Sequence, residues 1–172
     1  MNMRYKEERF KREGVEVLWV RIGLPPCEGL ESVGDFYREM GECAYRFACE
    51  RLLPYAEKCF DEDTDERKRF HFAPICYHLD ARVRYEDERL LSVFLEVSLF
   101  RKDRKKETRS FSDAQVWLRN SELLLSPREA LRVYWGREIG EKCYKPKGKI
   151  LLTERGAMEE REGKWQLLVP PS

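Results

Sequence analysis

The chain of 172 residues and 20.6 kDa is long enough for one domain with a sizeable hydrophobic core. Its 33 Lys and Arg nearly balance its 32 Asp and Glu, and the net charge of +1 excludes a global field that would steer it toward nucleic acid or an anionic membrane. No apolar run approaches the length of a membrane-spanning helix, and the charged residues 1–14 do not resemble a secretory signal. We therefore expect a soluble, cytoplasmic protein that begins with a charged segment.

The first predicted element is a β-strand over residues 15–24. Valine, leucine, isoleucine and tryptophan side chains fall on both of its faces, which is typical of a strand that is covered on both sides. Pro25 and Pro26 end this strand, because proline has no backbone N–H to donate to a sheet.

A long amphipathic helix is predicted over residues 32–60. Apolar side chains recur at helical spacing after Ser32, whose hydroxyl makes it a suitable N-cap. Pro54 interrupts the helix, because its ring clashes with the carbonyl four residues earlier, so we expect a kink or a restart near residues 51–53. The charged residues 61–69 contain no apolar side chain and are predicted to form a linker loop.

The second half of the chain is predicted to be rich in β-strands. Residues 75–85 and 91–99 alternate apolar and polar side chains and are joined by a short turn, which indicates an antiparallel hairpin with one face in water. A weaker strand follows over residues 110–118. The residues after Ser126 form a capping box that begins a short helix, and short strands separated by glycines complete the chain.

These elements predict an α+β fold in a single domain. We expect an antiparallel meander of about five or six strands, with one long helix packed on one face and a short second helix. The six cysteines include no CxxC pair, so they are expected to be reduced and mostly buried; they are residues 27, 43, 49, 59, 76 and 143.

Four segments of the sequence resemble a known domain family. They are LPPCEGLES with the following FYREM, RVRYEDERLLSVFLEVSLF, VWLRNSELLLSPREAL, and ILLTERGAMEER. Together they resemble the domain found in the extracytoplasmic part of lysozyme-sensing anti-sigma factors and in uncharacterised bacterial proteins. The resemblance spans residues 15–169 and implies an α+β fold in a bacterial protein, with no catalytic residue. The basic loop 101–106 replaces the family's Gly-rich turn, and residues 1–172 contain no segment that matches the family's membrane anchor, so lysozyme sensing is not expected.

One candidate site lies on a single predicted strand. Cys76, His78 and Asp80 occupy alternate positions and therefore point to the same face, and all three residue types bind metal ions. A metal site needs a further ligand from elsewhere, such as Cys59 or His71. The alternative interpretation is a half-exposed polar strand face without a ligand, and we predict neither a bound metal nor a cofactor.

A second candidate site is the charged loop 101–109. It carries six cations against Asp103 and Glu107, a local excess of four positive charges that favours an anion such as RNA or a lipid headgroup. No aromatic residue inside the loop is available to stack on a base, so nucleic acid is not the expected partner, and a solvated hairpin tip is the simpler interpretation. The six cations are Arg101, Lys102, Arg104, Lys105, Lys106 and Arg109.

The sequence contains no motif of a catalytic nucleophile, a zinc protease or a phosphate-binding loop. We therefore predict no catalytic residue and a non-enzymatic binding or regulatory module, whose partner is an unknown protein or a second copy of the chain. Two alternatives stay open. One is anion or RNA binding through loop 101–109, and the other is a metal-dependent enzyme that uses the strand at residues 76–80.

Overall fold

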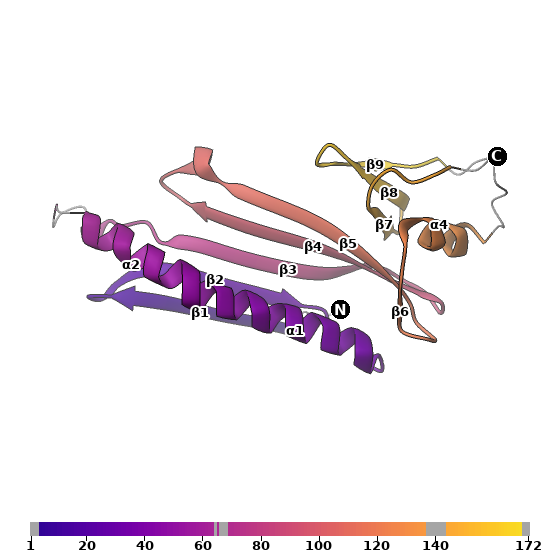
Figure 1. The fold of residues 1–172 in the computed structure, drawn as a ribbon, viewed down its shortest axis with the longest axis horizontal. Helices are drawn as coiled ribbons and strands as arrows, with labels where there is room; N and C mark the ends of the chain where they lie inside the picture. Colours follow the sequence, from indigo (N-terminus) through magenta and orange to yellow (C-terminus); the bar gives the residue numbers. More distant parts are fainter. Residues whose placement is uncertain (1–3, 64, 66–68, 137–143, 170–172) are drawn as a thin grey trace. The chain divides into compact units, whose positions relative to one another are not determined.

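The computed structural model describes residues 4–63, 65, 69–136 and 144–169. Over these residues it has a mixed α+β fold with strands in two sheets, which confirms the predicted fold class (Figure 1). The six-stranded sheet has the order β1 (Arg4–Arg12), β2 (Val15–Leu24), β3 (Ile75–Glu86), β4 (Leu90–Arg101), β5 (Arg109–Leu118) and β6 (Leu123–Leu125). The three-stranded sheet has the order β7 (Ile150–Thr153), β8 (Gly156–Arg161) and β9 (Lys164–Leu167).

The strand pairing differs from the predicted antiparallel meander. β2 and β3 are parallel, with Leu18 opposite Ile75, because the long helix between them returns the chain to the same end of the sheet. The sequence analysis also missed β1 in the charged N-terminal segment, and it missed the short strand β6. The last three strands form a sheet of their own rather than extending the first one.

The long helix has the predicted interruption. It consists of α1 (Glu31–Phe47), a π-helical turn η1 (Ala48–Leu52) and α2 (Leu53–Glu62). The N–H of Leu53 donates to the carbonyl of Ala48, five residues back, and Pro54, which has no N–H to donate, directly follows this turn at the start of α2. Asp61 and Glu62 belong to α2 rather than to a linker. No helix in the described ranges is long and apolar enough to cross a membrane.

The start of α1 is capped differently from the prediction. Ser32 lies inside the helix, and its backbone N–H donates to Oε1 of Glu122 at 2.8 Å. Val33 donates to the same oxygen at 3.4 Å. A carboxylate ninety residues away in the sequence therefore satisfies the helix N-terminus, where negative charge is also favoured by the helix dipole.

The chain divides into two compact units, each made of separate stretches. Unit 1 comprises Met1–Pro26, Asp35–Asp80 and Glu96–Phe111. Unit 2 comprises Cys27–Gly34, Ala81–Leu95 and Ser112–Ser172. The expectation that the chain forms a single domain stays a prediction, because the division into compact units does not test it.

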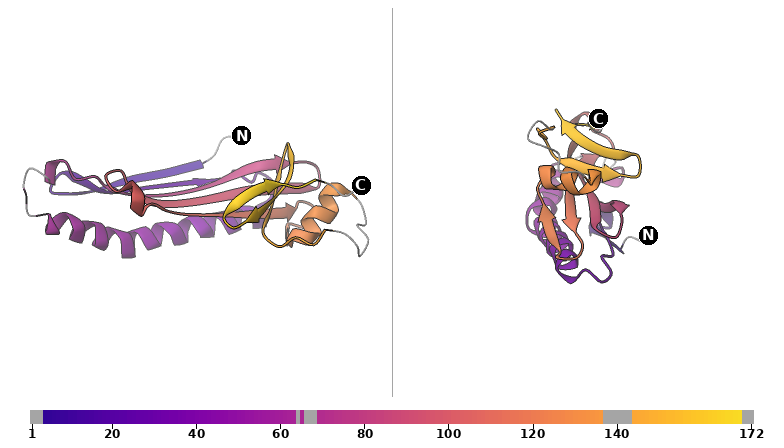
Figure 2. Two further views of the ribbon diagram at one scale, coloured as in Figure 1. Left: turned by 90° about the horizontal axis from the view of Figure 1, so that it is seen from above. Right: turned by 90° about the vertical axis from the view of Figure 1, so that its right-hand side faces the viewer.

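In unit 1 the long helix covers one face of the strands (Figure 2). Apolar residues of β2 such as Val20 and Ile22 are buried, and Phe47 of α1 contacts Tyr77 of β3 with ring centroids 5.6 Å apart. Helix and strands approach closely at Gly41, where a Cβ would lie 2.9 Å from Cδ1 of Leu24. A side chain at this position would therefore require the end of the Leu24 side chain to move.

Unit 2 is built around α4 (Pro127–Trp135) and the three-stranded sheet. The predicted capping box is present: Ser126 Oγ accepts from the Glu129 N–H at 3.2 Å, and Glu129 Oε2 accepts from the Ser126 N–H at 2.9 Å. This helix end is thus satisfied locally. The buried core around the helix consists of Leu90, Val116, Ala130, Leu131, Ile150, Leu152 and Ala157.

Unit 2 also contains a fully buried carboxylate. Glu159 accepts hydrogen bonds from the Tyr144 hydroxyl, from the Lys147 N–H at 3.0 Å and from Nε of Arg161 at 2.7 Å. Burial by itself would raise the pKa of Glu159, but these hydrogen bonds and the charge of Arg161 outweigh it and hold the pKa below its ordinary value of 4.5. The carboxylate therefore holds the segment before β7 against the three-stranded sheet through hydrogen bonds.

We predict that Glu159→Gln destabilises the protein in a pH-dependent way. A depressed carboxyl pKa adds stability above the unfolded pKa, and this contribution disappears as the pH falls through the folded pKa. Urea unfolding of wild type and variant should therefore show the largest difference in free energy near neutral pH and a shrinking difference below about pH 4.5. A difference that stayed constant over this range would contradict the assigned hydrogen bonds.

A second prediction concerns Gly148. A Cβ at this position would overlap the backbone oxygen of Glu160, which no rotamer change relieves. Gly148→Ala should therefore lower the free energy of unfolding by about 2 kcal/mol. Gly163→Ala is the control, since a Cβ there meets no atom within 4 Å and only the strain of its positive φ is added.

Candidate functional site

The parallel register of β2 and β3 sets side chains of the two strands next to each other. Trp19 is opposite Cys76, and Arg21 is opposite His78. Because Tyr77 contacts the long helix, its neighbour His78 points to the other face of the sheet. Unit 1 therefore has a second face, away from the helix, on which these four side chains gather.

His78 is enclosed on this second face. Only 8% of its surface is exposed, and its ring lies 4.4 Å from that of Trp19 and 5.4 Å from that of Phe100, edge to face in both cases. The prediction that this strand face lies in water is wrong at His78, because aromatic rings from the neighbouring strands cover it. Burial, assisted by the charge of Arg21, lowers the pKa of His78 below 6.5, and its Nε2 has no hydrogen-bond partner among the described residues.

The other two candidate metal ligands are engaged inside the chain. Cys76 is buried, with its Sγ 3.7 Å from the carbonyl oxygen of Pro74, and burial raises the pKa of its thiol. Asp80 pairs with Arg21 at 3.3 Å. No group of three metal-ligating side chains occurs among residues 4–63, 65, 69–136 and 144–169, so the metal hypothesis has no geometric basis in that part of the chain.

The structure brings the two sequence-predicted segments together in unit 1. Phe100, which directly precedes the basic loop, contacts His78, and Nζ of Lys102 lies 5.8 Å from the centre of the Trp19 ring. Arg9 lies over the same ring at 4.3 Å. The two cations come from β1 and from the basic loop, outside the strand that carries Trp19, so only the tertiary structure reveals that they lie over this ring.

The first arginine of the loop is held in place rather than solvated. The side chain of Arg101 is 14% exposed, lies 4.7 Å over the Phe72 ring and pairs with Asp103 at 3.0 Å. Farther along the loop, next to the single 3-10 turn η2 (Lys105–Glu107), Arg104 pairs with Glu107 at 3.8 Å. The loop thus neutralises both of its own carboxylates, while Lys102 carries no ion pair to any described residue.

A pocket of about 700 Å³ lies beside this loop, and we refer to it as the loop pocket. Its apolar lining comes from the helix and the strands, and the loop adds charged side chains. The charged lining consists of three cations, Arg101, Lys106 and Arg109, and the carboxylate of Glu107. Arg101 is paired with Asp103, and Glu107 is paired with Arg104. The lining residues are Leu52, Tyr55, Ile75, Leu99, Phe100, Arg101, Lys106, Glu107, Thr108 and Arg109.

The cysteines do not form the buried set that the sequence predicts. Among the five described cysteines, all of which are free, only Cys76 is buried, and Cys43 is exposed. Cys27, Cys49 and Cys59 are half-buried, and Cys143 lies outside the described residues. Two of the half-buried thiols, those of Cys49 and Cys59, lie on the long helix.

Comparison with known proteins finds a likeness in structure but none in sequence. No family model matches the sequence, and no curated protein matches it. Among solved structures, the chain is similar to a DUF3298 family protein from Pseudomonas aeruginosa, at 13% sequence identity and a TM-score of 0.40. The match covers 91% of this chain and 78% of that protein. The resemblance to the anti-sigma-factor domain stays a prediction.

The enclosure of His78 predicts a loss of stability in mild acid. Because its folded pKa lies below the unfolded value of 6.5, folding excludes a proton that the unfolded chain binds. Stability should therefore fall as the pH drops from 7 to about 5.5, and His78→Phe should flatten this dependence in urea unfolding. The exposed His71 provides the control: His71→Phe should leave the wild-type slope unchanged.

Proposed function

We propose that the chain is a non-enzymatic binding module of the cytoplasm, and that the loop pocket binds an anion with an apolar part. The observation that carries this proposal is the combination of an apolar lining with an excess of cations around one pocket. Ligand sites in proteins are typically concave and mostly apolar, with a few polar groups that orient the ligand. Here the charged groups favour a carboxylate, sulfonate or phosphate.

One cation of the pocket, Arg101, is held in place before any ligand binds. Phe72 and Asp103 hold the Arg101 guanidinium from two sides, so little side-chain entropy is lost when this group meets an anion. The hydroxyl of Tyr55 is a second polar group at the lining. A hydrogen bond with Cys59 raises the pKa of Tyr55 above its ordinary value of 10. Lys106 and Arg109 are exposed and supply charge at the rim.

The apolar lining favours this ligand class over a purely ionic one. Leu52 and Ile75 are buried, while Leu99 and Phe100 are half-buried, so an apolar group placed against the latter two removes more surface from water. A solvated hairpin tip, the simpler interpretation of the loop, provides no such surface. The aromatic side chains at the pocket, Tyr55 and Phe100, come from outside the loop, which explains why the loop sequence alone did not indicate them.

A pair of fluorescent probes tests the proposal. Anilinonaphthalene sulfonate is an aromatic anion, and phenylnaphthylamine has the same ring system without the sulfonate. We expect saturable binding of the sulfonate that weakens as salt is added, and at least roughly tenfold weaker binding of the neutral probe. Equal binding of the two probes, or binding without saturation, would contradict an anion site.

Variants locate the probe within the molecule. The double variant Lys106→Gln with Arg109→Gln should weaken sulfonate binding roughly tenfold, because it removes two of the three cations at the pocket. Lys147→Gln with Lys164→Gln is the matched control, since it removes two exposed lysines of unit 2. Circular dichroism should be the same for both. If both double variants weakened binding equally, the loop pocket would not be the site.

A further inference from the structure

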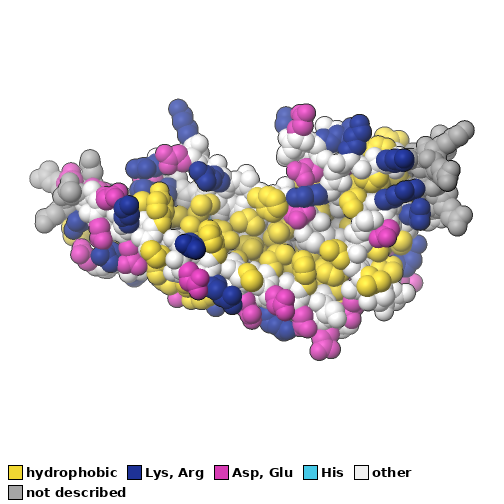
Figure 3. Space-filling model, viewed as in Figure 1, with side chains coloured by type: hydrophobic (Ala, Val, Ile, Leu, Met, Phe, Trp, Pro, Cys, Tyr) yellow, Lys and Arg dark blue, Asp and Glu magenta, His cyan; other side chains and the backbone are white. Residues whose placement is uncertain are grey.

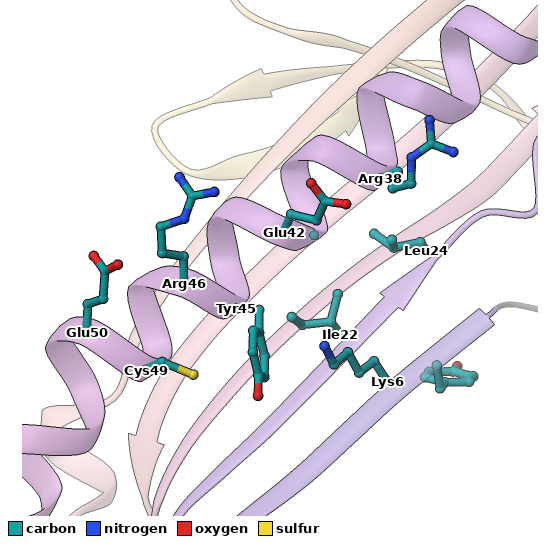
Figure 4. A pocket seen from close by; sticks show the side chains of 11 residues that line it. Lys6, Ile22, Leu24, Arg38, Glu42, Tyr45, Arg46, Cys49 and Glu50 are labelled. Atoms are coloured by element: carbon teal, nitrogen blue, oxygen red, sulfur yellow. The ribbon is translucent and has the colours of Figure 1, made fainter.

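The long helix carries an ordered row of charges on its solvent side. Arg38, Glu42, Arg46 and Glu50 are all exposed, and each follows the previous one by four residues, or about 6 Å along the helix axis. Their signs alternate from positive to negative along the row, which we call the helix stripe. In Figure 4 these four side chains follow one another along the helix, where they border the pocket that the figure draws, and Figure 3 shows acidic and basic side chains intermixed on the face that it draws.

The stripe does not pair within itself. Opposite charges four residues apart on a helix commonly form ion pairs, and every neighbouring couple in the stripe has this spacing. Arg38 pairs instead with Asp35, whereas Glu42, Arg46 and Glu50 have no ion pair with any residue in the described ranges. Three charges of the stripe are therefore available to a partner.

A groove of about 570 Å³ runs beside the stripe, between the helix and the first two strands (Figure 4). Ile22, Leu24 and the Tyr45 ring give it an apolar lining, and Nζ of Lys6 lies 3.7 Å from the centre of the Tyr45 ring. Gly41 adds no side chain to this lining. Apolar surface and unpaired charge thus lie next to each other on the same face of unit 1.

We propose that this face binds a second copy of the chain, with the two helices antiparallel about a two-fold axis. In this arrangement the row of charges in the second copy runs in the opposite direction. Each positively charged stripe residue therefore faces a negatively charged stripe residue of the second copy, and each negatively charged residue faces a positively charged one. Glu42 faces Arg46 of the second copy, and Arg38 faces Glu50 of the second copy. Each of these pairs occurs twice, as a two-fold axis requires. A parallel arrangement in register would instead place like charges together.

The groove explains why such an association does not depend on charge alone. Exposed ion pairs stabilise little by themselves, because water screens them and long side chains lose freedom. In the antiparallel arrangement, the aliphatic stems of Arg38 and Arg46 cover apolar lining of the opposite groove. The charges set the orientation and the register, and the removal of apolar surface from water supplies the remaining stabilisation.

Charge reversal tests the proposal by sedimentation velocity over a wide range of concentration. Wild type should form dimers as its concentration rises. Glu42→Arg and Arg46→Glu should each weaken the dimer about tenfold or more, since each makes two facing pairs repulsive. An equimolar mixture of the two variants should dimerise again, because each variant then presents the charges that its partner lacks at positions 42 and 46. The double variant E42R/R46E should also dimerise by itself.

Matched variants on the same helix provide the control. Glu39→Arg and Arg51→Glu reverse exposed charges outside the stripe and should leave the dimer constant within about twofold. Three results would overturn the proposal: a wild type that stays monomeric at all concentrations, single reversals that leave the dimer constant unchanged, or a mixture that fails to associate although both variants are folded. Rescue in the mixture would identify the facing pair directly.

Discussion

The parallel pairing of β2 with β3 requires the chain to cross the sheet between them, and the long helix is that crossing. This connection buries one face of the two strands and leaves the other face to Trp19, Arg21, Cys76 and His78. The helix lies close to β2 at Gly41, where an added Cβ would require the end of the Leu24 side chain to move. The remaining features of unit 1 depend on this arrangement, since it decides which side chains face the helix and which do not.

Two carboxylates of the chain are satisfied by specific hydrogen-bond partners. In unit 2, Glu159 is buried but receives three hydrogen bonds, and Glu122 reaches the start of the long helix. Such groups are expensive to bury unpaired, so they restrict the arrangement of the segments that hold them. His78 in unit 1 is different, because rings rather than hydrogen-bond donors surround its Nε2. An imidazole enclosed in this way is poorly placed for proton transfer.

The chain has almost equal numbers of positive and negative side chains, but these are unevenly distributed over unit 1. Unit 1 concentrates cations around an apolar pocket at the basic loop, and it also arranges alternating charges along the outer side of its helix. Both features combine charge with adjacent apolar surface, which is the combination used in recognition. The two proposals use these features: one assigns a small anion to the loop pocket, and the other assigns a second copy of the chain to the helix stripe and its groove.

The sequence by itself determined the local elements. Periodicity predicted β2 to the residue and β3, β4 and β5 to within two residues, the capping box at Ser126 predicted α4, and Pro54 predicted the break in the long helix. These signals act over a few neighbouring residues, so they survive without knowledge of the fold. Tertiary structure alone decided that β2 and β3 are parallel, that Glu122 caps the long helix, and that Trp19 and Phe100 cover His78. Each of these depends on contacts between residues far apart in the chain, and periodicity carries no information about which strands become neighbours.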